Sequence, residues 1–202
     1  MSTFVGLIPY AQHQGETYYL LGREAWMDGY ADSGKWSGFG GGMESCDSSV
    51  VQGAAREAYE ESMGFLGDID TIVSAIGGQR VYVSNDNKYG GRSINYTKAP
   101  TKTKRLARAY MIPYPIAYDP SLPDLYIRVY DYVAAAASPG AQRQTDGCPH
   151  KIPARDGWYE KAEIDWFTLQ EIFDEADSMR PAFLNSMRRI AESGQGPLFR
   201  LA

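Results

Sequence analysis

Several residue types are scarce in this chain of 202 residues, and each scarcity excludes a class of protein. Only two cysteines, Cys46 and Cys148, are present beside two histidines, so we expect neither a disulfide framework nor a zinc site built from these side chains. No apolar run is long enough to cross a bilayer, and the first twenty residues lack the basic start and apolar stretch of a secretory signal. We therefore expect a cytoplasmic protein that does not enter a membrane.

The composition is that of an ordinary globular domain. Hydrophobic residues make up 44% of the chain and charged residues 22%, which excludes a disordered or fibrous protein. A length of 202 residues exceeds one minimal core and falls short of two typical domains. Because no internal repeat or low-complexity linker divides the chain, we expect a single domain over residues 1–202.

The charge is distributed unevenly. The net charge of -5 argues against a protein that binds nucleic acid through its overall charge, yet residues 87–118 contain no Asp or Glu. The basic residues of that stretch are Lys88, Arg92, Lys98, Lys102, Lys104, Arg105 and Arg108. Our candidate substrate-binding residues among them are Arg92, Lys102, Lys104 and Arg105. Two interpretations stay open, either contact with the phosphates or backbone of an RNA-like substrate or a solvated loop.

Local patterns predict strands followed and preceded by helices. We expect strands over residues 4–9, 17–21, 36–39, 71–75, 80–84, 106–112 and 126–133, and long loops over 85–104 and 138–156. Helices are expected over about 48–63, after 168 and from 181 onward. Asp47 or Ser48 is expected to cap the first helix, Thr168 and Glu171 form a capping box before the second, and Pro181 fits the first turn of the last. This arrangement predicts an α/β layered domain.

The expected strand over 126–133 carries an aromatic stripe. Tyr126 and Tyr130 alternate there with aliphatic residues. They either line a pocket for a nucleobase, as candidate substrate-binding residues, or pack within the sheet, which is the commoner role of aromatic residues in strands.

Three carboxylates share one face of the first expected helix. Glu57, Glu60 and Glu61 stand at i, i+3 and i+4, a spacing at which like charges repel. A site for hard divalent cations would compensate this cost, because magnesium binds a few carboxylates and fills its other positions with water and phosphate oxygens. Arg56 beside them can orient a carboxylate. The alternative is a solvated acidic face without a function.

The segment from Gly42 to Phe65 resembles the signature of the Nudix hydrolase family. That signature is Gly, five residues, Glu, seven residues, Arg-Glu, an aliphatic residue, any residue, Glu-Glu, any residue, Gly, then an aliphatic residue. The matching residues, in order, are Gly42, Arg56, Glu57, Ala58, Glu60 and Glu61. The stretches 36–42 and 160–172 also resemble the strands that precede this segment and end the domain in the family.

Two positions depart from the signature. Ser48 stands where the family has its first Glu, which pairs with the Arg and supports the start of the helix, and Ser48 can cap the helix instead. Met63 stands where the family has Gly, and Gly64 follows one place late.

The resemblance implies a fold and a chemistry. The fold would be an α/β/α sandwich with a mixed β-sheet between helices. Magnesium or manganese would be held by Glu57, Glu60 and Glu61, with a backbone carbonyl near Gly41 or Gly42, and would neutralise a diphosphate. The catalytic set implied is Arg56, Glu57, Glu60, Glu61, Glu160 and Glu163. The base that activates water is left open between a glutamate of the signature and Glu160 or Glu163.

Three functions remain open at this stage. The first is a pyrophosphohydrolase acting on a nucleotide-type small molecule, such as a nucleoside-diphosphate derivative or a dinucleoside polyphosphate. The second is removal of the cap from messenger RNA, which some members of the family perform and which the basic stretch 88–108 favours. The third is a module with this fold that binds a nucleotide without hydrolysis, for which Ser48 and Met63 speak. A homodimer is the default expectation for the oligomeric state.

Overall fold

The structure is a computed structural model that describes residues 3–26, 28–84, 94–98, 109–137 and 160–193. Its strands are β1 (Phe4–His13), β2 (Glu16–Glu24), β3 (Trp36–Ser37), β4 (Phe39–Gly42), β5 (Arg80–Ser84), β6 (Ile94–Lys98), β7 (Ala109–Pro115) and β8 (Lys161–Thr168). Its helices are α1 (Val50–Glu61), α2 (Ile69–Ile76), α3 (Leu122–Ala137), α4 (Leu169–Asp174) and α5 (Pro181–Ser193), with a short 3₁₀ turn at Ala176–Ser178.

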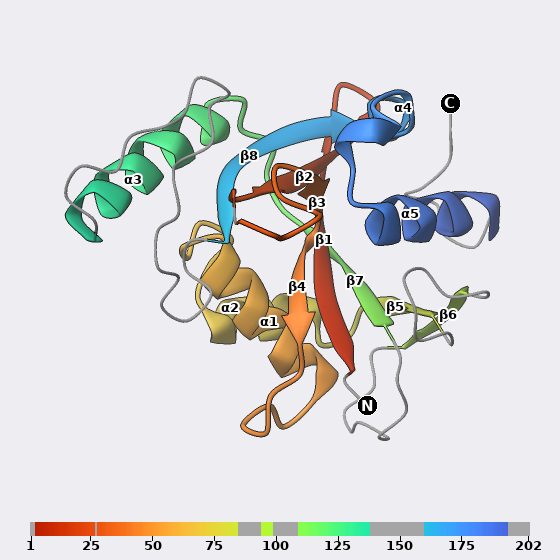
Figure 1. Ribbon diagram of the computed structural model, residues 1–202. Helices are drawn as coiled ribbons and strands as arrows, with labels where there is room; N and C mark the ends of the chain where they lie inside the picture. Colours follow the sequence, from red (N-terminus) through yellow and green to blue (C-terminus); the bar gives the residue numbers. More distant parts are fainter. Residues whose placement is uncertain (1–2, 27, 85–93, 99–108, 138–159, 194–202) are drawn as a thin grey trace.

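The strands form one mixed sheet of eight strands in the order β3-β2-β1-β7-β5-β6, with β4 paired to β1 and β8 paired to β2. The long strand β1 is the centre of this arrangement. Its first half, from Phe4 to Leu7, pairs antiparallel with β4, and its second half, from Tyr10 to His13, pairs antiparallel with β2. On its other edge β1 runs parallel to β7. β1 therefore pairs with two strands in succession, and the glycine-rich β4 lies beside its first half, next to α1 (Figure 1).

Helices cover both faces of the sheet, which confirms the predicted α/β fold class (Figure 1). Side chains alternate across β1, so Val5 and Leu7 join the core beneath α1, α2 and α3, while Ile8 joins the core beneath α4 and α5. Met187 and Ile190 of α5 are fully buried in that second core.

The interpretation of residues 71–75 as a strand is wrong, because they lie in α2. The side chain of Asp68 caps this helix by accepting a hydrogen bond from the Thr71 amide. Ile72 and Ile76, four residues apart, are the buried side chains of α2. A short apolar run carries no period of its own that separates a strand from one buried helix face.

The interpretation of residues 126–133 as a strand is also wrong, because they lie in α3. Tyr126 and Tyr130 are fully buried, and Ala134 follows four residues later with 4% exposure. Residues four apart lie on one face of a helix, and they also lie on one face of a strand, where every second residue points the same way. The tyrosines therefore fit both patterns. Tertiary packing selects the helix.

Smaller boundaries also differ from expectation. Strand β6 lies within the loop expected over 85–104 and pairs with β5. Ser49, rather than Asp47 or Ser48, caps α1 by accepting a hydrogen bond from the Gln52 amide. The capping box of Thr168 and Glu171 is present. The loop expected over 138–156 lies outside the described residues. In the part of the chain that the structure describes, no helix has the length and apolarity to span a membrane.

Candidate active site

The glycines of β4 bring the backbone of the sheet against helix α1. A Cβ atom on Gly40 would lie 2.4 Å from the carbonyl oxygen of Val5, and one on Gly41 would lie 2.6 Å from the Glu57 carboxylate. Only glycine permits approaches this close. Across from β4, α1 presents the small buried side chains Ala54 and Ala58 to the core. The Glu57 side chain therefore lies directly on the backbone of β4.

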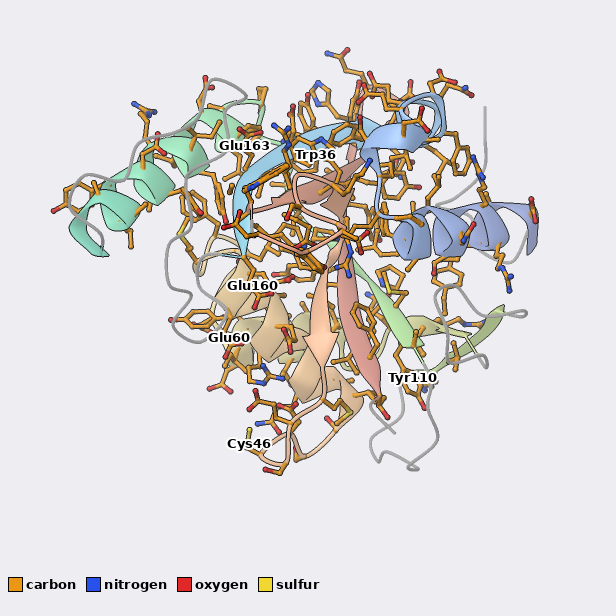
Figure 2. The ribbon with its side chains drawn as sticks, viewed as in Figure 1. Trp36, Cys46, Glu60, Tyr110, Glu160 and Glu163 are labelled. Carbon is orange, nitrogen blue, oxygen red and sulfur yellow. The ribbon has the colours of Figure 1, made fainter. Side chains whose placement is uncertain are left out.

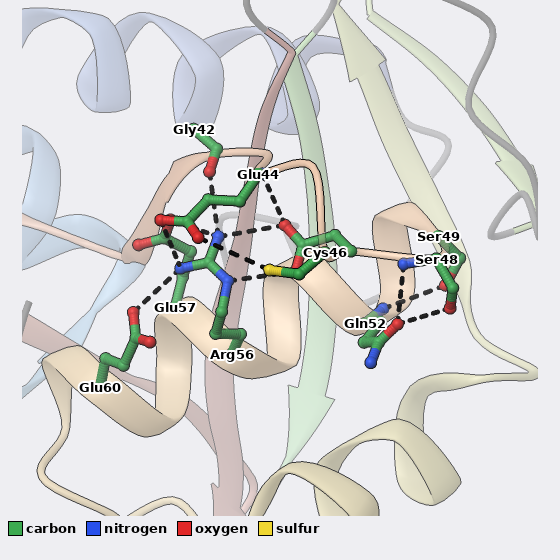
Figure 3. Close-up of polar contacts among 10 residues, drawn as sticks. Gly42, Glu44, Cys46, Ser48, Ser49, Gln52, Arg56, Glu57 and Glu60 are labelled. Atoms are coloured by element: carbon green, nitrogen blue, oxygen red, sulfur yellow. Dashed lines mark hydrogen bonds and ion pairs between the residues drawn. The ribbon is translucent and has the colours of Figure 1, made fainter. Parts of the chain in front are cut away.

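Arg56 holds the carboxylates of this site together (Figure 3). Its guanidinium lies 3.0 Å from a carboxylate oxygen of Glu57 and 2.9 Å from one of Glu60. It also donates to the Gly42 carbonyl at 3.0 Å. Its side chain is 12% exposed, so these charge-assisted contacts are largely shielded from water. Burial lowers the pKa of Arg56. Asp47 and the neighbouring glutamates raise this pKa by a larger amount, so the net shift is upward.

Asp47 fills the role of the glutamate that the signature has at position 48. Both of its carboxylate oxygens lie 3.1 Å from nitrogens of Arg56, which is a bidentate pair, and its side chain is 2% exposed. It also accepts a hydrogen bond from the Glu44 amide at 2.7 Å. Ser48 instead donates its amide and hydroxyl to the Gln52 side chain. Sequence reasoning treated Asp47 only as a helix cap, although a carboxylate one residue before the expected glutamate was the available clue.

Met63 departs from the signature in a different way. It has φ 52°, in the left-handed region that disfavours residues with a Cβ atom, and Gly64 follows with φ 78°. The turn that leaves α1 therefore places position 63 in a conformation that a glycine adopts at lower cost than Met63.

The three glutamates of α1 differ in their surroundings. The side chains of Glu60 and Glu57 are 22% and 12% exposed, whereas that of Glu61 is 2% exposed. One oxygen of Glu61 accepts a hydrogen bond from the Gly40 amide at 2.6 Å, and the other lies 3.6 Å from the ammonium group of Lys161. The i, i+3, i+4 spacing predicts a shared face but gives no indication of this graded burial.

Lys161 belongs to a buried network that sequence reasoning missed. Its Nζ atom lies 2.5 Å from a carboxylate oxygen of Glu24 and donates to the Ser37 hydroxyl at 2.9 Å. Arg180 contacts the same Glu24 oxygen at 3.0 Å. The network joins β2, β3 and β8 to Arg180, which directly precedes α5, and it reaches Glu61 through Lys161. In the sequence, the one distinctive feature of Lys161 is that it is the single basic residue between Asp156 and Asp177, a stretch rich in acidic residues.

Burial and mutual repulsion raise the pKa values of these carboxylates. Burial raises the pKa of Glu57 to about 7 against the opposing effect of Arg56, with Glu60 and Glu160 adding to the rise. Burial likewise raises the pKa of Glu61, which Lys161 opposes. The pKa of Glu160 is raised by burial and by Glu24. Carboxylates with raised pKa values that face one another are typical of functional sites.

The structure separates the two candidate bases. Glu160 precedes β8 on the side of α1, where its backbone carbonyl accepts a hydrogen bond from the Ala25 amide at 2.7 Å (Figure 2). Its charge acts on both Glu57 and Glu61. Glu163 lies farther along β8 and forms an ion pair with Arg23 at 3.3 Å (Figure 2). Glu160 therefore acts on the carboxylates of α1, whereas Glu163 is held by an arginine of the neighbouring strand.

Of the expected substrate-binding residues, the structure describes only Tyr126 and Tyr130, and it does not bring these two to the site. Tyr126 and Tyr130 are buried in the core, so the interpretation that they line a nucleobase pocket is wrong. The Tyr126 hydroxyl instead lies 3.0 Å from the carbonyl oxygen of Glu61 and 2.8 Å from that of Lys161. The four basic candidates lie outside the described residues: Arg92, Lys102, Lys104 and Arg105.

The donor set suits a hard divalent cation. Within the described ranges, no three His, Cys, Asp or Glu side chains already form a cluster that could hold a metal ion. Magnesium does not require such a cage, because it is usually bound by one or two carboxylates together with water and substrate phosphates. Glu57 and Glu60 offer those carboxylates beside the glycine backbone of β4. The Gly42 carbonyl is less suited to be a ligand, because it already accepts a hydrogen bond from Arg56.

Comparison with known proteins gives structural likenesses. No family model and no curated protein matches the sequence. Among solved structures, a mutT/nudix family protein from Listeria innocua is similar with a TM-score of 0.49 and 14% identity, over 95% of this chain and 92% of that one. Ap4A hydrolase from C. elegans is similar with a TM-score of 0.47 and 12% identity, over 96% of this chain and 98% of that one.

A third similar structure is the NUDIX domain of Shewanella oneidensis NrtR complexed with ADP ribose. Its TM-score is 0.45 and its identity 13%, over 96% of this chain and 88% of that domain. The structures from Listeria innocua and Shewanella oneidensis come from the family that the segment from Gly42 to Phe65 resembles. At such identities and TM-scores, the likeness concerns the course of the chain and says nothing of its chemistry.

Proposed function

We propose that this protein is a metal-dependent pyrophosphohydrolase of the Nudix type. Its substrate would be a nucleoside-diphosphate derivative or a dinucleoside polyphosphate, and we place its activity in the cytoplasm. The observation that carries the proposal is the packing of Glu57 and Glu60 around Arg56 on the glycine backbone of β4. Asp47 supplies to Arg56 the carboxylate that this chain lacks at position 48, where the signature has a glutamate.

Glu57, Glu60 and Glu61 would hold magnesium or manganese. The bound cation would neutralise the diphosphate and polarise a phosphorus–oxygen bond. Arg56 orients Glu57 and Glu60 from the side, so that both carboxylates keep one geometry. No atom of another described residue lies within 4 Å of the Cβ position of Gly42, which leaves room for phosphate oxygens beside them.

Glu160 is the proposed general base. A water molecule attacks one phosphorus, and its oxygen forms the new phosphorus–oxygen bond while the bond to the bridging oxygen breaks. Glu160 takes the proton of the attacking water, and the bridging oxygen leaves with the other phosphate. Burial and the Glu24 carboxylate raise the pKa of Glu160, which makes it a stronger proton acceptor than an exposed glutamate.

The test is hydrolysis of a substrate panel with magnesium or manganese, read by chromatography. The panel holds ADP-ribose, NADH, dinucleoside polyphosphates, nucleoside triphosphates, a sugar nucleotide and capped RNA. We expect cleavage at a diphosphate, and a loss of roughly 100-fold or more in the double variant Glu57→Gln, Glu60→Gln. The matched control is Glu44→Gln, whose carboxylate is 3.9 Å from Arg56 and 62% exposed and which should retain activity.

Other outcomes identify the competing functions. Cleavage of capped RNA alone would assign the decapping function, which the charge of residues 88–108 favours. A nucleotide that stabilises the protein in a thermal shift but is cut with neither metal would replace the enzyme with a binding module. Sedimentation of the active sample would show whether it is a homodimer.

A further inference from the structure

Lys161 stands out among the charged residues because its side chain is fully buried. Burying an ammonium group is costly unless it is paired and hydrogen-bonded. Glu24 and Ser37 satisfy two of its three N–H donors at hydrogen-bonding distance. A second carboxylate, that of Glu61, lies 3.6 Å from the same ammonium group. The lysine therefore has its firm anchor on β2 and β3, and from this anchor it faces the most buried glutamate of the proposed site.

The chain makes room for this lysine at one residue. A Cβ atom on Gly22 would lie 2.8 Å from both Cγ and Cδ of Lys161, closer than a real Cβ atom approaches. Gly22 lies on β2 directly beside β8 and next to Ser37 of β3. The absent side chain lets the aliphatic part of Lys161 cross over β2 and reach Glu24.

The backbones that carry Lys161 and Glu61 are also joined. The hydroxyl of Tyr126, from α3, is within hydrogen-bonding distance of the carbonyl oxygens of both residues. Because this tyrosine is fully buried, its contact fixes the end of α1 relative to the start of β8. Side chain and backbone thus both hold Lys161 against Glu61.

We propose that Lys161 is a positioning residue for the metal site, which holds the Glu61 carboxylate in one orientation through its anchor on Glu24. One oxygen of Glu61 is fixed by the Gly40 amide, and the Lys161 ammonium sets the direction of the other. This inference rests on the proposed function, in which Glu61 is one of the ligands of the cation. Outer partners of this kind typically change metal affinity or activity by about 10–100-fold when they are removed.

Positioning and simple charge compensation predict opposite results. An ammonium group 3.6 Å from a metal ligand repels the metal, so its removal alone would leave cation binding unchanged or make it tighter. If Lys161 positions Glu61, its removal or displacement weakens cation binding even where the net charge beside Glu61 is unchanged. The sign of the change in Mn²⁺ affinity therefore separates the two roles.

The experiment measures Mn²⁺ binding to the full chain by EPR and hydrolysis by steady-state kinetics. The first variant is the double change Lys161→Met, Glu24→Gln, which removes one charge of each sign and leaves no unpaired Glu24. The second is Gly22→Ala, which keeps every charge and displaces only the lysine stem. The control is Ile190→Ala, which removes a fully buried side chain from the opposite core and lowers stability without touching the network.

We expect the Mn²⁺ dissociation constant to rise about 10–100-fold in the double variant and in Gly22→Ala, with kcat lowered more than KM is changed. Ile190→Ala should keep the affinity of the unmodified protein. Unchanged or tighter Mn²⁺ binding in both variants overturns the inference while the proposed function stands. Absence of saturable Mn²⁺ binding in the unmodified protein overturns the proposed function and the inference with it. Should the double variant fail to fold, Gly22→Ala decides the matter alone.

Discussion

Replacing Asp47 with alanine should destabilise the protein, because Asp47 anchors Arg56 in place of the glutamate missing at position 48. The change removes two contacts of 3.1 Å to the Arg56 guanidinium and one hydrogen bond of 2.7 Å from the Glu44 amide. The Asp47 side chain is 2% exposed, so water replaces these contacts poorly. A neighbouring serine cannot compensate, since Ser48 is already bonded to Gln52.

The magnitude follows from the partners that remain. Breaking a buried ion pair by removing one partner costs about 3–5 kcal/mol when the other charge is left alone. Arg56 keeps Glu57 and Glu60 at about 3 Å and retains 12% exposure, which reduces the cost. We therefore expect the free energy of unfolding to fall by about 2–3 kcal/mol.

Urea denaturation followed by circular dichroism measures this change. Glu44→Ala is the matched control, because Glu44 contacts the same arginine from 3.9 Å with a side chain that is 62% exposed. That control should cost no more than about 0.5 kcal/mol. A loss below about 0.5 kcal/mol for Asp47→Ala would refute the idea that Asp47 replaces the signature glutamate.

Three further predictions concern the segment around α1, each measured as a difference in unfolding free energy. Met63→Gly should be more stable than Met63→Ala by about 1 kcal/mol, because position 63 has φ 52°. This order is the reverse of the order inside a helix, where alanine is favoured. An advantage for alanine would contradict the left-handed conformation of this turn. Gly40→Ala should lose more than about 3 kcal/mol, since its Cβ atom would lie 2.4 Å from a carbonyl oxygen, whereas Gly42→Ala, with nothing within 4 Å, should be tolerated. Ser49→Ala should cost about 1 kcal/mol through loss of the α1 cap, and Ser48→Ala much less; equal losses would show that the cap is misassigned.

Much of the fold was accessible from local patterns. The capping box at Thr168, the proline at the start of α5 and the strands β1 and β2 were all predicted, because each depends on residues close in sequence. Helices α2 and α3 were predicted as strands. Their apolar residues repeat at a spacing that serves both element types, and the choice depends on which neighbours cover them.

The candidate site divides along the same line. The spacing of Arg56, Glu57 and Glu60 along one helix places them together in any structure that contains the helix, so the sequence by itself determined this part. Which carboxylate is buried was not determined, because burial of Glu61 depends on Gly40 of β4 and on Lys161, a hundred residues later in the chain.

The sequence by itself determined the local elements whose partners lie within one helical turn or one hairpin. Only the tertiary structure decided that Asp47 takes the place of a missing glutamate, that Tyr126 lies in the core, and that Lys161 reaches Glu24 across Gly22. The physical reason is that contact energies between distant segments depend on register and packing, which no short window of residues contains.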